Sequence, residues 1–209
     1  MVLTEKHRHI LLKAEELFAV RGFDGATVRD IADAAGVNLA MISYYFGSKE
    51  KLMEALFRER MTLMRIRLET LIMDDNYTPI QKVDILIDEY VNKVIQQQSF
   101  YKIMLCEQVI NNNPLVLKML RELKLSYANL VGVLIEAGQK QKIFKKDIDV
   151  MFLLNTMTGT VTQMVINKEY YKEYNNYKKL NAADFNELLR TKLSAHVKLV
   201  FKAILGYEQ

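Results

Sequence analysis

Residues Thr27–Phe46 read TVRDIADAAGVNLAMISYYF, and this stretch decides the fold of the first part of the chain. Thr27 and Asp30 form a capping box, in which the Thr hydroxyl accepts a hydrogen bond from a backbone N–H and the acid reaches back to the cap. Gly36 ends this helix after about two turns, and Asn38 caps a second helix that runs to Phe46. Two short helices joined by a glycine-containing turn are typical of a helix-turn-helix.

The seam between these two helices depends on three residues at fixed spacing. Ala32 lies four residues before Gly36, where the helices cross closely and a small side chain fits. Gly36 takes the positive φ of the turn at little cost, and Ile42, six residues later, points back into the seam. The same spacing also fits a plain helical hairpin in a bundle, so the outward face of the second helix has to distinguish the two.

That outward face carries short, uncharged side chains that can hydrogen-bond, where a solvated helix normally carries long charged ones. A helix in the major groove places its N-terminal residues at the base edges, where Asn, Ser and the Ala methyl group are suitable readers. Tyr and Thr hydroxyls can reach phosphate oxygens, and a phosphate at the start of the next helix would suit Lys49. The predicted DNA-binding residues are Thr27, Val28, Asn38, Leu39, Ala40, Ser43, Tyr44, Tyr45 and Lys49.

A longer helix over residues 4–21 precedes this motif, and Gly22 is suited to close it. Its apolar positions follow the helical period and predict one buried face: Ile10, Leu11, Ala14, Leu17 and Phe18. Glu15 and Glu16 are expected to face outward.

This part of the chain resembles the TetR family of bacterial regulators in three places: GVNLAMISYYFGSKEKL at 36–52, Ala14-x-x-Leu17-Phe18, and Arg21-Gly22-Phe23-x-x-Ala26-Thr27-x-x-x-Ile31-Ala32. Ser43 departs from the family pattern, because many members have a tyrosine there. The resemblance covers about residues 4–60. It implies an all-α chain with an N-terminal three-helix DNA-binding domain at residues 1–50. A helical ligand-binding and dimerisation domain follows at 51–209.

The remaining sequence predicts further helices, for about nine in all. Thr78-Pro79 and Asn113-Pro114 open helices by a cap followed by proline. Helices are expected over residues 49–73, 78–97, 99–110, 114–139, 149–167 and 184–205, the last opened by a capping box at Asp184. The tyrosine-rich stretch 168–177 is interpreted as an exposed polar connection rather than a binding loop.

The helix over 149–167 mixes small, apolar and hydroxyl side chains with few charges, which indicates burial in the core or against another chain. The resemblance implies that the last two long helices form a four-helix dimer interface. A dimer also suits DNA recognition, because one short recognition helix by itself contacts too few bases. The predicted interface residues are Leu154, Thr158, Val161, Thr162, Val165, Leu189, Leu193, His196, Val197 and Val200.

The resemblance also implies an inducer pocket among the central helices. Met and aromatic side chains suit an adaptable apolar pocket, although taken singly each is better explained as plain core. The candidate residues are Phe57, Met61, Met64, Phe100, Met104, Gln108, Tyr127, Met157 and Gln163. No charged residue stands out as an anchor, so the expected ligand is apolar or weakly polar.

Composition narrows the function classes. The net charge is +4, but residues 1–50 carry six Lys and Arg against seven Asp and Glu, so charge adds little to the DNA-binding interpretation. Cys106 is the sole cysteine, no signal peptide or membrane-length apolar run is present, and a cytoplasmic location is expected. His7 and His9 point to different faces, and no catalytic or cofactor motif occurs. We therefore expect no enzyme, metal or cofactor.

The leading hypothesis is a homodimeric repressor that binds a palindromic operator and is released by a small ligand. The alternative is a DNA-binding regulator without an inducer, whose C-terminal domain serves dimerisation or a protein partner. A third class is a helical metabolite- or lipid-binding protein without DNA affinity.

Overall fold

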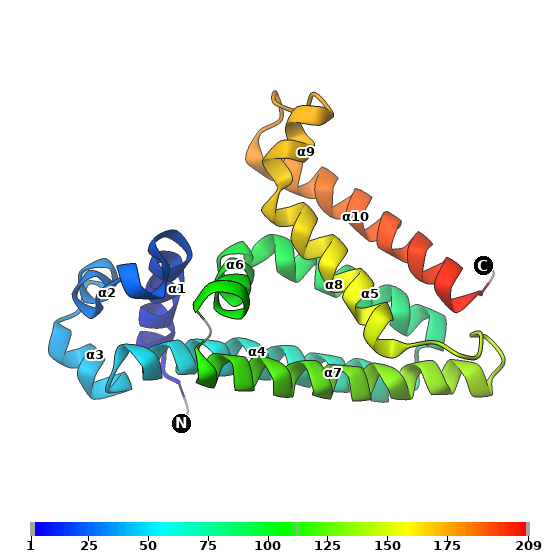
Figure 1. Ribbon diagram of the computed structural model, residues 1–209, viewed down its shortest axis with the longest axis horizontal. Coiled ribbons are helices and arrows are strands. Elements are labelled where there is room, and N and C mark those ends of the chain that lie inside the picture. The colour runs from blue at the N-terminus through cyan, green and yellow to red at the C-terminus, as the bar shows by residue number, and fades with distance from the viewer. Residues whose placement is uncertain (1–2, 112, 208–209) are drawn as a thin grey trace. The chain divides into compact units, whose positions relative to one another are not determined.

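A computed structural model of the chain describes residues 3–111 and 113–207. Within these ranges it contains ten α-helices, one π-helix and no strand, which confirms the predicted all-α class (Figure 1). The helices are α1 Glu5–Gly25, α2 Val28–Ala35, α3 Leu39–Phe46, α4 Lys49–Met73, α5 Pro79–Gln96, α6 Gln98–Cys106, the π-helix η1 Glu107–Asn111, α7 Pro114–Lys140, α8 Val150–Ile166, α9 Lys168–Tyr174 and α10 Ala182–Leu205. None of the described helices is both long and apolar enough to cross a membrane.

The chain packs into two compact units. The first comprises Met1–Met64 and Ser99–Leu123, and the second comprises Arg65–Gln98 and Lys124–Gln209. The boundaries fall inside α4 and α7 rather than near residue 50, because the first half of α4, α6 and the start of α7 pack with the N-terminal helices. The predicted division at residue 50 stays a prediction about function, because these units describe packing alone.

In the first unit, α1 packs on α2, and α2 packs on α3. Gly22 has φ 74° and ψ 172°, a conformation that only glycine adopts readily, and it breaks the helical path of α1 where the sequence predicted an end. The α1 face built from Ile10, Leu11, Ala14 and Phe18 is buried as predicted. This face holds the short helices that follow.

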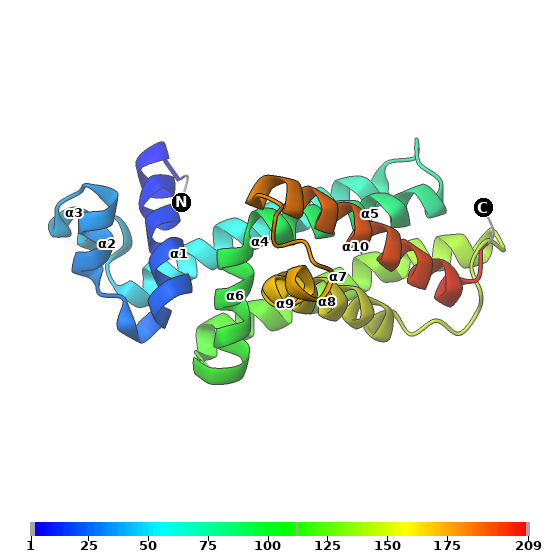
Figure 2. The same cartoon turned by 90° about the horizontal axis from the view of Figure 1, so that it is seen from above.

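In the second unit, α5 packs against both α8 and α10, and α8 also contacts α10 (Figure 2). The side chains between them are apolar and almost fully buried, including Ile87 on α5, Val161 on α8 and Leu189 on α10. Asp88 adds polar links between α5 and α10, since it accepts hydrogen bonds from Ser194 and, at 2.6 Å, from Lys198 Nζ.

Three helical segments differ from the sequence prediction. The last helix begins at Ala182, because Asn181 rather than Asp184 is its cap: Asn181 Oδ1 accepts from the Asp184 N–H at 2.9 Å. The predicted helix over 99–110 is divided into α6 and the π-helix, whose Glu107 is buried while Val109 and Ile110 are exposed. The stretch 168–177 contains a short helix, α9, instead of a plain connection.

Candidate DNA-binding face, ligand residues and dimer residues

The start of α2 is fixed by the predicted capping box. Thr27 Oγ1 accepts from the Asp30 N–H at 3.1 Å, while Asp30 Oδ2 accepts from the Thr27 N–H at 2.9 Å and from the Thr27 hydroxyl at 2.6 Å. The hydrogen bonds from the Thr27 hydroxyl and N–H lower the pKa of the Asp30 carboxyl, and Arg21 at 3.2 Å acts in the same direction. The Thr27 hydroxyl proton is thus used inside the box, and a phosphate contact from it would have to break this bond.

The turn between α2 and α3 has the geometry that the sequence predicted. Gly36 lies in the left-handed region at φ 62° and ψ 35°, and its N–H donates to the Asp33 carbonyl at 3.2 Å. Ala32 and Ile42 are 2% and 1% exposed, so they form a closed seam between the two helices. The seam fixes which side of α3 remains outside.

α3 begins at the Asn38 cap, whose Oδ1 accepts from the Met41 N–H at 2.8 Å. This bond uses one of the two lone pairs of the oxygen, so the amide NH₂ and one lone pair of Asn38 are left for a base edge in this conformation. The buried residues of α3 are Ile42 and Phe46. Its opposite face is exposed along Leu39, Ala40, Ser43 and Tyr44, and Tyr44 is 84% exposed.

Tyr45 differs from Tyr44 because it packs onto the N-terminal helix. Its ring centroid lies 4.3 Å from that of His7, and His7 Nδ1 is 2.7 Å from Thr4 Oγ1 in the cap of α1. Tyr45 is therefore half-buried and connects α3 to α1. Of the two predicted tyrosines, Tyr44 is the one presented to a partner.

Lys49 contacts the end of α1 rather than open solvent. Its Nζ donates to the Phe23 carbonyl at 2.9 Å and to the Ala26 carbonyl at 3.2 Å, and it lies 4.3 Å from the centroid of the Phe23 ring. These contacts satisfy carbonyls at the end of α1. The predicted phosphate contact of Lys49 stays a prediction, and a substitution there would also damage the fold.

Glu15 is the residue of the head that sequence reasoning misplaced, because it was expected to face outward and is only 4% exposed. Its Oε2 accepts from Arg60 Nε at 2.9 Å, and Arg8 pairs with Glu59 at 2.9 Å beside it. Burial raises the pKa of Glu15, and the Arg60 guanidinium opposes this rise. The signal was present in the sequence, since Glu15 stands four residues after Leu11 and three before Phe18, on the apolar side of α1.

The predicted ligand residues are divided between the two units. Phe57, Met61, Met64 and Phe100 are buried in the first unit, where the rings of Phe57 and Phe100 lie 5.0 Å apart. Met104 and Gln108 are half-buried there. In the second unit Met157 is buried and Tyr127 is half-buried.

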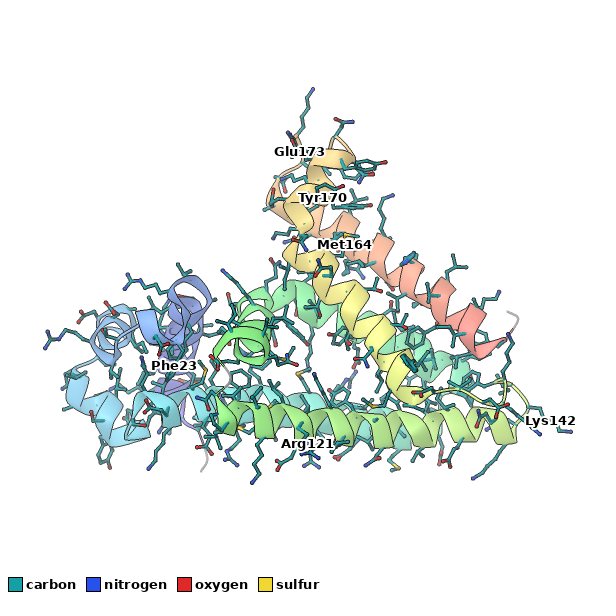
Figure 3. The ribbon with its side chains drawn as sticks, viewed as in Figure 1. Phe23, Arg121, Lys142, Met164, Tyr170 and Glu173 are labelled. Atoms are coloured by element: carbon teal, nitrogen blue, oxygen red, sulfur yellow. The ribbon has the colours of Figure 1, made fainter. Side chains whose placement is uncertain are left out.

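Gln163 does not belong to an interior pocket. It is exposed, and with Thr160, Met164, Asn167, Tyr170 and Tyr171 it lines an open groove of about 710 Å³ on the surface. Met164 on α8 and Tyr170 on α9 are labelled in Figure 3. The reason is geometric, because Met157 and Gln163 are six residues apart on α8 and so point to different sides of the helix.

Most of the predicted dimer residues lie inside the single chain, and their place at an interface stays a prediction. Seven of them are buried within one chain: Leu154, Val161, Thr162, Val165, Leu189, Leu193 and Val197. Thr158 and Val200 are half-buried, and His196 is exposed. The apolar stripes of α8 and α10 were identified correctly, but they face α5 and each other.

Thr162 shows what these residues do instead. Its Oγ1 lies 3.2 Å from the Tyr90 hydroxyl on α5, inside the second unit. Burial raises the pKa of Tyr90 to about 12, and burial together with nearby Tyr90 raises the pKa of Tyr127. The sequence did not single out Tyr90, although it stands on the apolar helix that opens at Thr78.

Tyrosines are exposed where a polar connection was expected. Tyr170 and Tyr174 on α9 are 74% and 76% exposed and stack with ring centroids 6.5 Å apart. Tyr171 and Tyr177 are half-buried instead, and the Tyr177 ring centroid lies 6.5 Å from that of Phe185 at the start of α10.

A capped helix-turn-helix with an uncharged exposed face, carried by an otherwise helical chain, defines a DNA-binding transcription regulator. The model of the family "Bacterial regulatory proteins, tetR family" matches residues 10–56. The chain belongs to this family, as the sequence resemblance indicated.

Relatives extend the similarity beyond the head. The fatty acid metabolism regulator protein of Bacillus subtilis is 29% identical over 171 residues, which are 79% of this chain and 87% of that protein. The HTH-type transcriptional repressor NicS of Pseudomonas putida is 31% identical over 143 residues, or 67% and 66% of the two chains. The structure of the fatty acid degradation regulator FadR from Bacillus halodurans has a TM-score of 0.72 at 23% identity and covers 95% of this chain and 97% of that one. The last similarity shows that the fold is shared along nearly the whole chain.

Proposed function

We propose that this chain is a homodimeric repressor that places the α3 face of each protomer in the major groove of an operator. The observation that carries the proposal is the exposed, uncharged surface of α3, which the Asn38 cap and the buried Ile42 hold in one orientation. Ser43, Tyr44 and the Asn38 amide supply hydrogen-bonding groups there. Base edges are read by such groups, while phosphate contacts set the register.

Two protomers related by a two-fold axis read two half-sites separated by about 34–36 Å, so the operator is palindromic. The outward sides of α8 and α10 offer exposed apolar side chains for the contact between protomers, including Phe152 at 75% and Leu199 at 66% exposure. A repressor of this kind works where the chromosome is, in the cytoplasm.

For the ligand, we propose a long-chain acyl compound as the first candidate. The fatty acid metabolism regulator of Bacillus subtilis is among the relatives, and a structure of FadR from that organism, with a TM-score of 0.67 to this chain, holds stearoyl-CoA. The buried predicted ligand residues are apolar, and Met side chains adapt to flexible ligands. A ligand that binds better to the conformation unable to span two half-sites lowers operator affinity by that difference.

The experiment is fluorescence anisotropy with DNA fragments selected from a random pool on the full chain. Specific binding should weaken steeply as salt rises, because bound phosphates release counterions. Stearoyl-CoA should release the DNA and raise the melting temperature of the protein, whereas coenzyme A alone should do neither.

Each proposal can fail separately. Absence of DNA affinity at every salt concentration contradicts the regulator and favours a metabolite-binding protein. Specific DNA binding that stearoyl-CoA leaves unchanged, with no shift in melting temperature, contradicts the acyl ligand and favours a regulator whose C-terminal part serves dimerisation or a protein partner.

A further inference from the structure

The exposed surface of α3 lies in a stretch of the chain without any charged residue. From Ala34 to Ser48 the sequence contains no Asp, Glu, Lys, Arg or His, and α3 lies within this stretch. At its start, the cap residue Asn38 and the next two residues, Leu39 and Ala40, are exposed. Because a recognition helix contacts base edges with its N-terminal residues, these three side chains determine which bases the face can distinguish.

Each base presents its own groups in the major groove. Guanine offers two acceptors, N7 and O6, which the paired donors of Arg or Lys match best, and cytosine offers an amino group that suits a carboxylate. Adenine offers one acceptor and one donor, which match the amide of Asn or Gln, and thymine offers a methyl group that suits an apolar side chain. A face with one amide and two apolar residues, and with neither cation nor carboxylate, therefore matches A·T pairs.

Asn38 keeps both kinds of hydrogen-bonding group for an adenine. Its Oδ1 accepts from the Met41 N–H at 2.8 Å, and this bond holds the amide at the N-terminal tip of α3. The second lone pair of the oxygen and the NH₂ group can pair with the amino group and N7 of one adenine. The cap therefore orients the amide for a base edge without using up its hydrogen-bonding capacity.

Leu39 is 43% exposed in the first turn of α3, and Ala40 beside it is exposed as well. Covering such apolar side chains is favourable because it removes apolar surface from water. The thymine methyl group is the apolar group that base edges offer in the major groove. Ser43 and Tyr44 on the same face carry hydroxyls, which both donate and accept and so distinguish bases less sharply.

Two exposed cations on the helices that flank α3 are the alternative readers of guanine. Arg29 stands in the first turn of α2, the helix that crosses the DNA backbone in a helix-turn-helix. Lys51 lies at the other end of α3, because its Nζ is 4.0 Å from the position that a Cβ on Gly47 would take. Both cations are therefore suited to phosphates, which carry no sequence information.

We infer that each operator half-site is read at A·T base pairs, with thymine methyl groups against Leu39 and Ala40 and an adenine at the Asn38 amide. Arg29 and Lys51 bind phosphates, and the head reads no guanine. The inference rests on the proposed binding of α3 in the major groove and names the class of DNA sequence that this face prefers.

The thymine contacts are tested on operators selected with the full chain. Each thymine of a half-site is replaced, one at a time, by deoxyuridine, which lacks only the methyl group. At least one replacement should lower the affinity of the parent about fourfold, the value of one buried methyl group. Leu39→Ala should make the affinity independent of the methyl group that Leu39 contacts. Leu12→Ala on α1 is the matched control, since Leu12 is 44% exposed, and it should respond to deoxyuridine as the parent does.

The adenine contact is tested by Asn38→Asp, because aspartate also caps a helix but has no amide N–H to donate. Replacing an adenine by 7-deazaadenine removes its N7 acceptor. At the contacted adenine this replacement should lower the affinity of the parent about fivefold, the value of one hydrogen bond, and should leave the affinity of the Asn38→Asp variant unchanged. An unchanged melting temperature of the variant shows that the cap is retained.

The outcomes separate the inference from the proposed function. If no deoxyuridine changes the affinity of the parent, or if Leu39→Ala responds as Leu12→Ala does, the A·T readout is wrong while the DNA-binding regulator remains. Arg29→Ala should weaken all operators alike, as the loss of a phosphate contact does. A preference for a G·C pair that Arg29→Ala relaxes would show guanine read from α2 and overturn the inference. A chain that selects no DNA contradicts the proposed repressor itself.

Discussion

The outward faces of α3 and α8 are both uncharged, yet the chain holds these two helices in different ways. The buried residues of α3 are Ile42 and Phe46, and its orientation depends on the Asn38 cap and the Gly36 turn. α8 buries side chains along its whole length, from Leu153 to Val165. An absence of charge therefore does not identify the partner. Hydroxyl and amide groups on a capped helix suit a base-lined groove, whereas a largely apolar face suits another protein helix.

The largest expected effect separates the two sides of α8. Val161 is fully buried, so Val161→Asp places an unpaired charge in the core of the second unit. The free energy of unfolding should fall by about 4 kcal/mol or more, which lowers the melting temperature by about 10 °C or more. Phe152→Asp changes the exposed side of the same helix and should leave the fold intact while weakening the dimer. Calorimetry and light scattering measure the two effects.

Val20→Asp is the matched control for Phe152→Asp, because Val20 is a similarly exposed apolar residue, at 80%, on α1. It should change neither the melting temperature nor the association of the protomers. If the Val161→Asp protein kept its melting temperature but became monomeric, Val161 would belong to the dimer interface. The assignment of the buried and outward sides of α8 would then be reversed.

The comparison also shows how far the sequence determines a helix. Periodicity predicted the apolar stripe of α8 correctly, but a stripe looks the same whether it faces α5 or a second chain. The burial of Val161 and the hydrogen bond between Thr162 and Tyr90, neither of which the sequence reveals, favour the first of these. The exposure of Glu15 was mispredicted in a similar way. Its residue type suggested an exposed side chain, whereas its position on α1 and its ion pair with Arg60 favour burial.

The head was predicted more completely because its determinants are local. The Thr27 box, the Asn38 cap and the Gly36 turn each involve residues within four positions, and the structure contains all three. The engagement of Lys49 by Phe23 and Ala26 was not predictable in this way, because it joins residues more than twenty positions apart. Contacts of that range depend on packing rather than on local sequence.

A smaller effect is expected on the α3 face. Tyr44→Ala should lower operator affinity by about tenfold, since one lost hydrogen bond to DNA is worth about 1–1.5 kcal/mol. The melting temperature should not change, because the side chain is exposed. Tyr44→Phe separates the hydroxyl from the ring. Anisotropy on the selected operator is the measurement.

Tyr174→Ala is the matched control on α9, where the side chain is 76% exposed. It removes a similarly exposed tyrosine from a helix outside the proposed DNA-binding face, so operator affinity should stay the same. Equal losses for Tyr44→Ala and Tyr174→Ala would contradict the assignment of the α3 face.

The smallest effect concerns the cap that orients the head, and it depends on pH. The hydrogen bonds from Thr27 lower the pKa of Asp30 in the folded chain below its unfolded value of about 3.8. The ionised carboxylate therefore stabilises the fold at pH values above the unfolded pKa, and this contribution is lost as the pH falls through the folded pKa. Asp30→Asn should lower the melting temperature slightly at pH 7, and the difference from the parent should shrink as the pH falls through the folded pKa of Asp30.

Asp33→Asn removes the same charge from the same helix outside the capping box, and it provides the comparison for Asp30→Asn. If general charge on α2 mattered, both variants would lose stability equally at pH 7. If only Asp30→Asn lowers the melting temperature, and the difference disappears as the pH falls, the hydrogen-bonded cap itself stabilises α2. α3 has only two buried residues and packs on α2 through a closed seam, so its orientation then depends on the local caps. The orientation of α8 depends instead on the core.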